Sequence, residues 1–319
     1  MAIGVTASEM IETAGLAKRY GDIVALDHLD LQIPRGEVFG LLGPNGAGKT
    51  TTLRLLLGFA RPTAGSARVA GFDVRTQLAD AHRHLTHLSG DLALWPQLSG
   101  RETLDLLGTL HGGYDVAYRD ALTERFALDP DRRVRAYSKG NRQKVGLVAA
   151  FMSRPDVLIL DEPTVGLDPL MEVVFRDCVR EAGANGQTVL LSSHVLSEVE
   201  AVCDRVGILR TGRLIDLGSL DDLRGLSAHS VEATFAGAPP DLHDVPGVSA
   251  VTVADHVVRC QVKGSMESLL RVLADTGAVQ VTSREPSLEE LFLSHYGDDS
   301  AATGGERSVE STQNCGDGI

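Results

Sequence analysis

The spacing of hydrophobic residues changes along the chain and predicts where strands and helices lie. Apolar and polar positions alternate from 11 to 42, which predicts antiparallel strands that lead into a central strand at 37–42. The run at 157–160 is continuously apolar, as is typical of a strand that is covered on both faces. These patterns predict antiparallel strands first and a buried strand further along the chain.

Helical spacing dominates between these strands. Apolar residues three and four positions apart predict a mainly helical stretch from 75 to 152. Further helices, predicted at 49–58, 170–184 and 196–203, alternate with strands such as the one at 205–210. This alternation of strand and helix predicts an α/β domain with a mostly parallel sheet.

The composition changes near 225, where loop-like segments rich in Gly, Ser and Pro begin. Three alternating strands, a helix, a fourth strand and a last helix then predict a small α+β domain. Ser287 and Glu290 have the spacing of a capping box at the start of that last helix. The residues after it are small and polar, which predicts a disordered tail. The predicted organisation is an N-terminal tail at 1–10, a main domain at 11–225, a small domain at 226–297 and a C-terminal tail at 298–319.

Charge and hydropathy limit the classes of function. The chain has 319 residues, of which 43% are hydrophobic, and its net charge of −13 gives general nucleic-acid binding no electrostatic support. No stretch approaches the roughly 18 apolar residues that a spanning helix needs, and the N-terminus does not resemble a secretory signal. Four cysteines without metal-ligand spacing fit a reducing cytoplasm. We therefore expect a cytoplasmic protein that leaves any membrane spanning to another polypeptide.

A glycine-rich segment, GPNGAGKTT, separates the strand at 37–42 from the helix that follows. Its glycines allow backbone conformations in which successive N–H groups converge on an anion at the start of the helix. Lys49 would reach the β- and γ-phosphates of a nucleotide, and Thr50 would present its hydroxyl to Mg²⁺. A tight turn with an incidental lysine is the alternative. The expected nucleotide contacts in this segment are Gly43, Pro44, Asn45, Gly46, Ala47, Gly48, Lys49, Thr50 and Thr51.

Two more segments carry candidate chemistry. The buried strand at 157–160 ends in Asp161, placed to hold Mg²⁺, and Glu162, placed to polarise an attacking water. An ordinary acidic strand end is the alternative. Ser138 and Gly140, in YSKGNRQ, begin a helix and could bind the phosphate of a nucleotide held by a facing second copy. Taken alone, this last segment is better explained as a plain helix cap.

The order GPNGAGKTT, YSKGNRQ, LILDEPTVGLDP and SSH resembles the ATP-binding subunit of ABC transporters over residues 10–225. The resemblance implies an α/β fold: a P-loop NTPase with a RecA-like core, an antiparallel β subdomain and a helical subdomain at about 85–152. It also implies ATP and Mg²⁺ as ligands. The family motifs fall at 43–51 (Walker A), 137–141 (signature), 157–162 (Walker B), 166–169 (D-loop) and His194 (switch histidine).

The resemblance also implies roles for single residues. Lys49, Glu162 and His194 are the expected catalytic residues, with His194 contacting the γ-phosphate. Tyr20 lies where the family places an aromatic ring on adenine. On their own, Tyr20 and His194 would be interpreted as a turn aromatic and a satisfied polar residue. Their places in the ordered set of motifs favour the functional interpretation.

The chain departs from the family pattern at two points. Most members have LSGGQ as the signature, whereas this chain has a lysine, Lys139, between Ser138 and Gly140, a form that resembles the drug-export branch. The family's usual metal-contacting glutamine aligns with Gly90. Asp91, the next residue, could serve the metal instead, which makes Thr50, Asp161 and Asp91 the expected metal ligands.

The resemblance therefore implies an ATPase subunit of an exporter of drugs, lipids or other hydrophobic compounds, peripheral at the cytoplasmic face of the membrane. Its expected partners are integral membrane permease subunits, contacted through the surface at 85–135, and a second ATP-binding subunit, with no nucleic acid. The C-terminal domain resembles the accessory domain of that branch. Trp95 is interpreted as a core residue rather than as a partner contact. The alternatives are an ABC ATPase that acts on nucleic acid or ribosomes, an importer ATPase and a metabolic kinase.

Overall fold

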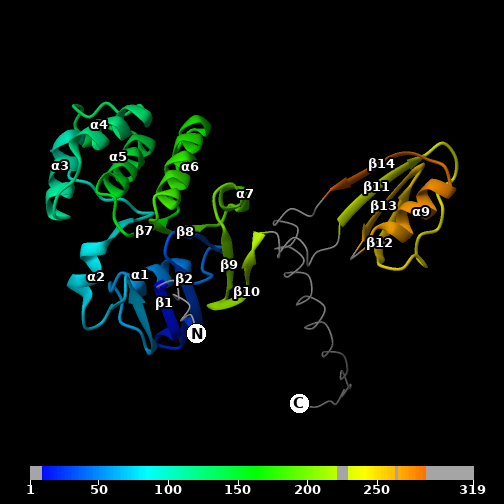
Figure 1. Ribbon diagram of the computed structural model, residues 1–319, viewed down its shortest axis with the longest axis horizontal. Coiled ribbons are helices and arrows are strands. Elements are labelled where there is room, and N and C mark those ends of the chain that lie inside the picture. Colours follow the sequence, from blue (N-terminus) through cyan, green and yellow to red (C-terminus); the bar gives the residue numbers. More distant parts are fainter. Residues whose placement is uncertain (1–8, 221–228, 263–264, 285–319) are drawn as a thin grey trace, which may run out of the picture. The chain divides into compact units, whose positions relative to one another are not determined.

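The computed structural model describes residues 9–220, 229–262 and 265–284, which form two compact units (Figure 1). Several predictions from the sequence lie outside the described residues: the first eight residues, the boundary near 225, the last helix with Ser287 and Glu290, and the tail at 298–319. The predicted N-terminal tail at 1–10 is too long, because the first strand already begins at Glu9.

The first unit contains most of the helices and strands. Its strands are β1 (Glu9–Tyr20), β2 (Ile23–Pro34), β3 (Val38–Leu42), β4 (Ala64–Val69), β5 (Phe72–Asp73), β6 (Leu85–Leu88), β7 (Val157–Asp161), β8 (Thr188–Ser193), β9 (Arg205–Arg210) and β10 (Arg213–Ser219). Its helices are α1 (Lys49–Leu56), α2 (Leu78–His84), α3 (Gly100–Leu110), α4 (Val116–Arg125), the 3₁₀ helix η1 (Val134–Ala136), α5 (Lys139–Met152), α6 (Pro169–Ala184) and α7 (Leu196–Glu200).

A six-stranded sheet in the order β10-β9-β3-β8-β7-β6 forms the centre of the first unit. Strands β9, β3, β8, β7 and β6 run parallel, and β10 is antiparallel to β9. Every residue of β3 and β8 is buried, as the apolar composition of these strands requires when helices cover both faces. The predicted α/β fold with a mostly parallel sheet is confirmed.

A second sheet, in the order β2-β1-β4-β5, is antiparallel and belongs to the same unit. Helix α1 contacts β2 and β4 of this sheet and β7 of the central sheet. One hydrophobic core therefore joins the two sheets through α1, with Leu31, Phe39 and Leu55 among its buried members. The predicted antiparallel strands near the N-terminus are confirmed.

Helices α3, α4 and α5 gather at one end of the first unit (Figure 1). Ser99 caps α3 through a capping box with Glu102, and Asp115 caps α4, so the starts of both helices are specified locally. The predicted mainly helical stretch at 75–152 is confirmed, except that residues 85–88 form the strand β6. This strand completes the edge of the central sheet beside β7.

The second unit is a four-stranded antiparallel sheet in the order β12-β13-β11-β14, with one described helix. Its elements are β11 (His229–Phe235), β12 (Val248–Ala254), β13 (Val257–Val262), α9 (Glu267–Asp275) and β14 (Ala278–Arg284). Alternate residues of β11 and β13 are buried and form a core of their own with Leu269 and Leu273 of α9. Among the described helices of both units, none combines the length and the apolar character that crossing a bilayer requires.

Candidate active site

The carboxyl ends of neighbouring parallel strands bring the candidate residues together. Strand β3 ends at Leu42, which pairs with Ser193 at the end of β8. The phosphate loop therefore begins beside His194, the residue that follows β8. Because parallel strands all end at one edge of their sheet, segments far apart in the sequence meet there.

The next two strands extend the same edge. Asp161, at the end of β7, pairs with Ser192 of β8, and Leu88, at the end of β6, pairs with Leu160 of β7. The loop that contains Asp91 therefore follows a strand directly beside the one that carries Asp161. The structure thus brings together the phosphate loop and the acidic residues that the sequence predicted separately.

The phosphate loop requires glycine at defined positions. Gly48 has a φ of 111°, and a Cβ at this residue would lie 2.7 Å from the carbonyl oxygen of Ala25. A Cβ on Gly43 would lie 2.4 Å from the carbonyl oxygen of Leu209. Gly48 precedes α1 and offers no side chain to cap it, so the first N–H groups of α1 remain available for phosphate oxygens.

Lys49 lies almost buried at the start of α1, with a side chain that is 6% exposed. Its Nζ donates to the carbonyl oxygen of Gly43 at 2.5 Å and to that of Pro44 at 3.3 Å, and lies 3.5 Å from Oε1 of Glu162. A buried ammonium is stable only when such oxygens surround it. The loop and Glu162 therefore hold the lysine at the centre of the site.

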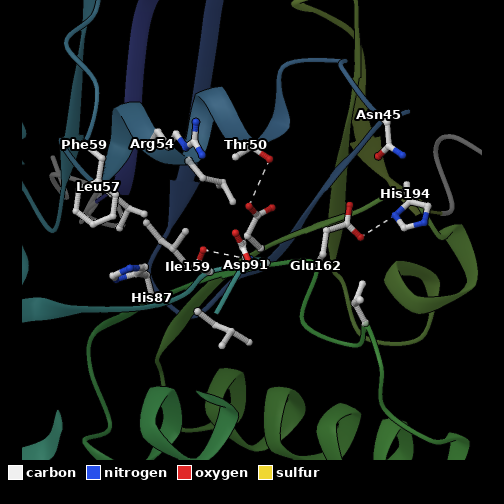
Figure 2. A pocket seen from close by; sticks show the side chains of 16 residues that line it. Asn45, Thr50, Arg54, Leu57, Phe59, His87, Asp91, Ile159, Glu162 and His194 are labelled. Atoms are coloured by element: carbon white, nitrogen blue, oxygen red, sulfur yellow. Dashed lines mark hydrogen bonds and ion pairs between the residues drawn. The ribbon is translucent and has the colours of Figure 1, made fainter. Parts of the chain in front are cut away.

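Glu162 is held in an unusual backbone conformation, with a φ of 47°. A positive φ is uncommon for residues other than glycine and often occurs at functional sites. Its backbone N–H donates to the carbonyl oxygen of Ser192 at 3.1 Å, which fixes this turn. Figure 2 shows that the Glu162 carboxylate points toward His194, whose Nδ1 lies 2.7 Å from Oε2.

Oxygen atoms gather around Asp161. The hydroxyl of Thr50 donates to Oδ2 of Asp161 at 3.4 Å, and the hydroxyl of Ser192 donates to Oδ1. Asp91 lines the same pocket, and its backbone N–H donates to the hydroxyl of Ser89. Ser192, which orients Asp161, was not predicted as a site residue, although it lies in the SSH segment that precedes His194.

The oxygen donors of this site fit a magnesium ion. Mg²⁺ prefers hydroxyl and carboxylate oxygens and is usually bound by one or two carboxylates together with substrate phosphates. Thr50 and Asp161 supply a donor set of that kind next to the phosphate loop. Within the described residues, no group of three or more His, Cys, Asp and Glu residues could hold a metal by itself.

The pocket that contains these residues has a volume of about 340 Å³ and extends beyond the acidic residues (Figure 2). Its far wall includes Arg54, Phe59 and His87, none of which was predicted as a site residue. Phe59 and His87 meet edge to face with ring centroids 5.2 Å apart. Burial lowers the pKa of His87, and the nearby His82 lowers it further, so the neutral imidazole is favoured.

Three predicted nucleotide contacts that lie outside the phosphate loop, Tyr20, Ser138 and Gly140, do not line this pocket. Tyr20 is 47% exposed, and Nζ of Lys18 lies 4.7 Å from its ring centroid. The Ser138 hydroxyl caps α5 by accepting from the backbone N–H of Asn141 at 3.2 Å, as a plain helix cap would. A Cβ on Gly140 would lie 2.4 Å from the carbonyl oxygen of Gly166, so this glycine permits close packing.

The remaining predicted residues fall within or beside the phosphate loop. Asn45 and Thr50 line the pocket, whereas Ala47 is buried within the loop. The interpretation of Trp95 as a core residue is wrong, because its side chain is 47% exposed.

Comparison with known proteins identifies the family of this chain. The family model described as "ABC transporter" matches residues 26–165. The daunorubicin resistance ATP-binding protein DrrA3 of Streptomyces coeruleorubidus is 40% identical over 92% of this chain and 98% of its own length. The bacitracin transport ATP-binding protein BcrA of Enterococcus faecalis is 31% identical over 89% of this chain and 95% of its own.

A solved structure leads to the same group of proteins. The solved structure of an ATP-binding subunit of an ABC transporter is 32% identical to this chain and superposes with a TM-score of 0.63. The match covers 67% of this chain and 92% of the solved one. The matched family residues include the phosphate loop, Asp161 and Glu162.

Proposed function

The chain belongs to the ATP-binding proteins of ABC transporters and is an ATPase subunit of a transporter, and from this premise we propose its cargo class, its partners and the roles of its site residues. The observation that carries the proposal is the meeting of Lys49, Glu162 and His194 at one edge of the parallel sheet. The cargo is a drug or a similar hydrophobic compound. The relatives named for daunorubicin resistance and bacitracin transport support this class.

Glu162 acts as the general base that takes a proton from the attacking water. Its Oε2 is held by His194 and its Oε1 faces Lys49, so the carboxylate is fixed between an imidazole and an ammonium group. A base that is held in place needs little reorganisation to accept the proton. His194 orients Glu162 through Nδ1 and turns its other ring nitrogen to the γ-phosphate.

Lys49 neutralises charge on the β- and γ-phosphates. Its Nζ exchanges the carbonyl oxygens of Gly43 and Pro44 for phosphate oxygens, while the N–H groups of the loop and of α1 surround the same phosphates. Thr50 and Asp161 would hold Mg²⁺, with Asp91 as a third oxygen donor from the neighbouring loop. A magnesium ion held there would supply positive charge that offsets the charge of the phosphates.

Ser138, Gly140 and Tyr20 complete the site in a dimer. Ser138 and Gly140 act on the nucleotide held by a second ATP-binding subunit, and neither lines the pocket of its own chain. Gly140 packs closely against the carbonyl oxygen of Gly166, so the signature contacts the D-loop of the same chain. Tyr20, half exposed at the end of β1, stacks on adenine.

Integral membrane permease subunits are the further partners, so the chain lies at the cytoplasmic face of the membrane. The surface at 85–135 contacts them, and the exposure of Trp95 supports this placement. The main domain at 11–225 carries out the hydrolysis, with its helical subdomain at about 85–152. The small domain at 226–297 stabilises or regulates the dimer.

A Glu162→Gln variant tests the dimer and the base together. This variant keeps the shape and the hydrogen bond to His194 but cannot take a proton, so it should bind ATP and hydrolyse it at least about a hundredfold more slowly. With Mg²⁺ and ATP, its molar mass in multi-angle light scattering should double. ADP is the matched control and should leave a monomer. A variant that stays monomeric with ATP, with and without its permease, would contradict the proposal.

A further inference from the structure

Helix α7 follows His194 and packs against β3 and β8 of the central sheet. Its close approach depends on Gly40 of β3, because a Cβ at this residue would lie 2.3 Å from Cγ1 of Val199. Val199 is fully buried, and its carbonyl oxygen accepts from the backbone N–H of Cys203 at 2.9 Å. The sheet therefore holds α7 at a fixed distance from the strand ends that carry the site.

Glu198, on α7, accepts two hydrogen bonds with its carboxylate. The hydroxyl of Thr164 donates to Oε1 at 2.5 Å, and the hydroxyl of Ser193 donates to Oε2 at 2.7 Å. Thr164 is 6% exposed and Ser193 is fully buried. Hydrogen bonds to an ionised acceptor are short and roughly twice as strong as those between neutral groups, and low exposure strengthens them further. The carboxylate thus uses each of its oxygens to hold a different segment of the chain.

The first of these segments is the turn that follows Glu162. The backbone N–H of Val165 donates to the carbonyl oxygen of Glu162 at 3.3 Å, and that of Leu167 donates to the carbonyl oxygen of Thr164 at 2.9 Å. Glu162 itself has a φ of 47°, a conformation that persists only when surrounding contacts hold it. The hydrogen bond from Thr164 to Glu198 is a contact of that kind, two residues away from Glu162.

The second segment carries His194. Its side chain is 46% exposed, so packing alone holds it weakly. The hydroxyl of Ser193, the residue before it, accepts from the backbone N–H of Val195 at 2.9 Å while it donates to Glu198. One serine hydroxyl thereby fixes the chain on both sides of the histidine. Nδ1 of His194 lies 2.7 Å from Oε2 of Glu162 (Figure 2), so the anchored backbone sets the position of the proposed base.

We propose that Glu198 is a positioning residue for ATP hydrolysis: its carboxylate ties the turn after Glu162 to the segment that carries His194 and so maintains the contact between these two side chains. The inference rests on the proposed function, which assigns the two residues as the base and its orienting partner. Glu198 is not one of the described residues that line the nucleotide pocket, so it acts through its neighbours rather than on the substrate. Because small displacements of reacting groups cost much rate, a loosened pair should slow the chemical step more than it weakens ATP binding.

Removal of the carboxylate tests this role. Glu198→Ala in the full chain should lower kcat for ATP at least about tenfold, because the two segments lose their common anchor. KM and the Kd of a non-hydrolysable ATP analogue should stay within about threefold of the parent, since the phosphate loop, Thr50 and Asp161 are unchanged. Glu198→Gln keeps the shape and one accepting oxygen, so its kcat should lie between those of the parent and the alanine variant. ATP turnover over a range of concentrations and calorimetry measure these constants.

A double variant distinguishes positioning from general support of the fold. In the Glu162→Gln background, Glu198→Ala should lower the remaining rate by less than about twofold, because positioning a side chain that cannot accept a proton gains nothing. Thr164→Val removes one of the two hydrogen bonds at nearly constant shape and should reproduce part of the loss in kcat, which keeps the test decisive if the alanine variant folds poorly. Glu124→Ala, which removes an exposed carboxylate from α4, is the matched control and should keep the kcat of the parent.

The outcomes separate the inference from the proposed function. If Glu162→Gln abolishes hydrolysis while Glu198→Ala and Thr164→Val keep the kcat of the parent, Glu198 has no positioning role and the proposed function stands. An equal loss from Glu198→Ala in the parent and in the Glu162→Gln background, or a rise in KM as large as the fall in kcat, would also overturn the inference, since the carboxylate would then support the site as a whole. If Glu162→Gln turns over ATP like the parent, the proposed base is wrong and this inference fails with it.

Discussion

The six-stranded sheet of the first unit and the four-stranded sheet of the second unit differ in which loops lie at their edges. In the first unit, parallel strands β3, β8, β7 and β6 end at one edge, so four loops converge there. In the second unit, every neighbouring pair is antiparallel, so successive strands end at opposite edges. Parallel topology concentrates loops in one place, and the candidate chemistry of this chain lies in that place.

Charge is arranged differently as well. In the first unit, Lys49 and Glu162 face each other with side chains that are 6% and 19% exposed. In the second unit, Arg259 pairs with Glu232 across the open face of the sheet, where both side chains are about half exposed. Partly buried charges interact strongly and can serve catalysis, whereas exposed pairs contribute little. The difference indicates that the second unit is stabilised mainly by its hydrophobic core. The first unit also holds the partly buried pair of Lys49 and Glu162, which can serve catalysis.

The largest expected effect tests the buried pair of Lys49 and Glu162 in the first unit. Lys49→Ala should reduce ATP hydrolysis at least about a hundredfold, because the phosphates lose their buried cation. Arg271→Ala, which removes an exposed cation paired with Glu267 in the second unit, is the matched control and should leave hydrolysis unchanged. ATP turnover of both variants is measured with and without Mg²⁺, and circular dichroism verifies that each variant is folded. Equal turnover by the two variants would remove the contrast between the units.

The parts of the site that are encoded by adjacent residues could be predicted from the sequence. Glycine, lysine and threonine at fixed spacing specify the phosphate loop, because its geometry is set by the local backbone. The acidic pair after the apolar run at 157–160 was likewise predictable, since a buried strand must end where polar residues begin. The ordered set of motifs then predicted the fold.

The contacts between distant segments could not be predicted in the same way. The LTHL run of β6 is too short to distinguish from the helical stretch around it, so the edge that brings Asp91 beside Asp161 was missed. Strand β10 was also missed, because it is defined by pairing with β9 rather than by a strong pattern of its own. The orientation of Asp161 by Ser192 depends on the register between β7 and β8, which a single sequence does not give.

The second expected effect tests the core of the smaller unit. Phe235 is 4% exposed, and Phe235→Ala should destabilise this unit by about 3–4 kcal/mol through lost burial and a cavity. Basal ATP hydrolysis, measured at a protein concentration that keeps the ATP-bound dimer formed, should stay within about twofold, since Lys49 and Glu162 lie in the other unit. Urea unfolding followed by hydrogen exchange shows which unit has lost stability. The control is Val253→Ala, at a residue that is 55% exposed, which should lower the free energy of unfolding by less than about 0.5 kcal/mol. Loss of hydrolysis in parallel with the second unit's stability would show that the two units depend on each other.

The smallest expected effect concerns a structural ion pair at the start of the central sheet. Asp156 lies 2.8 Å from both Nδ1 of His84 and Nη1 of Arg35, and these partners lower the pKa of its carboxyl. Because the pKa is lower in the folded chain, the folded state binds fewer protons than the unfolded state just below the ordinary aspartate pKa of about 3.9. The contribution is therefore present above about pH 4 and is lost as the pH falls through the lowered value.

Asp156→Asn should accordingly reduce the free energy of unfolding by about 0.5–1 kcal/mol near pH 7, because the carboxylate is only about one third exposed but still partly screened. The difference from the parent should shrink as the pH is lowered toward about 3, where the parent's own carboxyl becomes protonated. Glu232→Gln in the second unit removes an exposed pair and should change stability less at neutral pH. Urea titrations across this pH range measure all three chains. A constant difference between the Asp156→Asn variant and its parent from pH 7 to pH 3 would show that the aspartate acts through shape rather than charge, and that this ion pair of the first unit resembles the exposed pairs of the second.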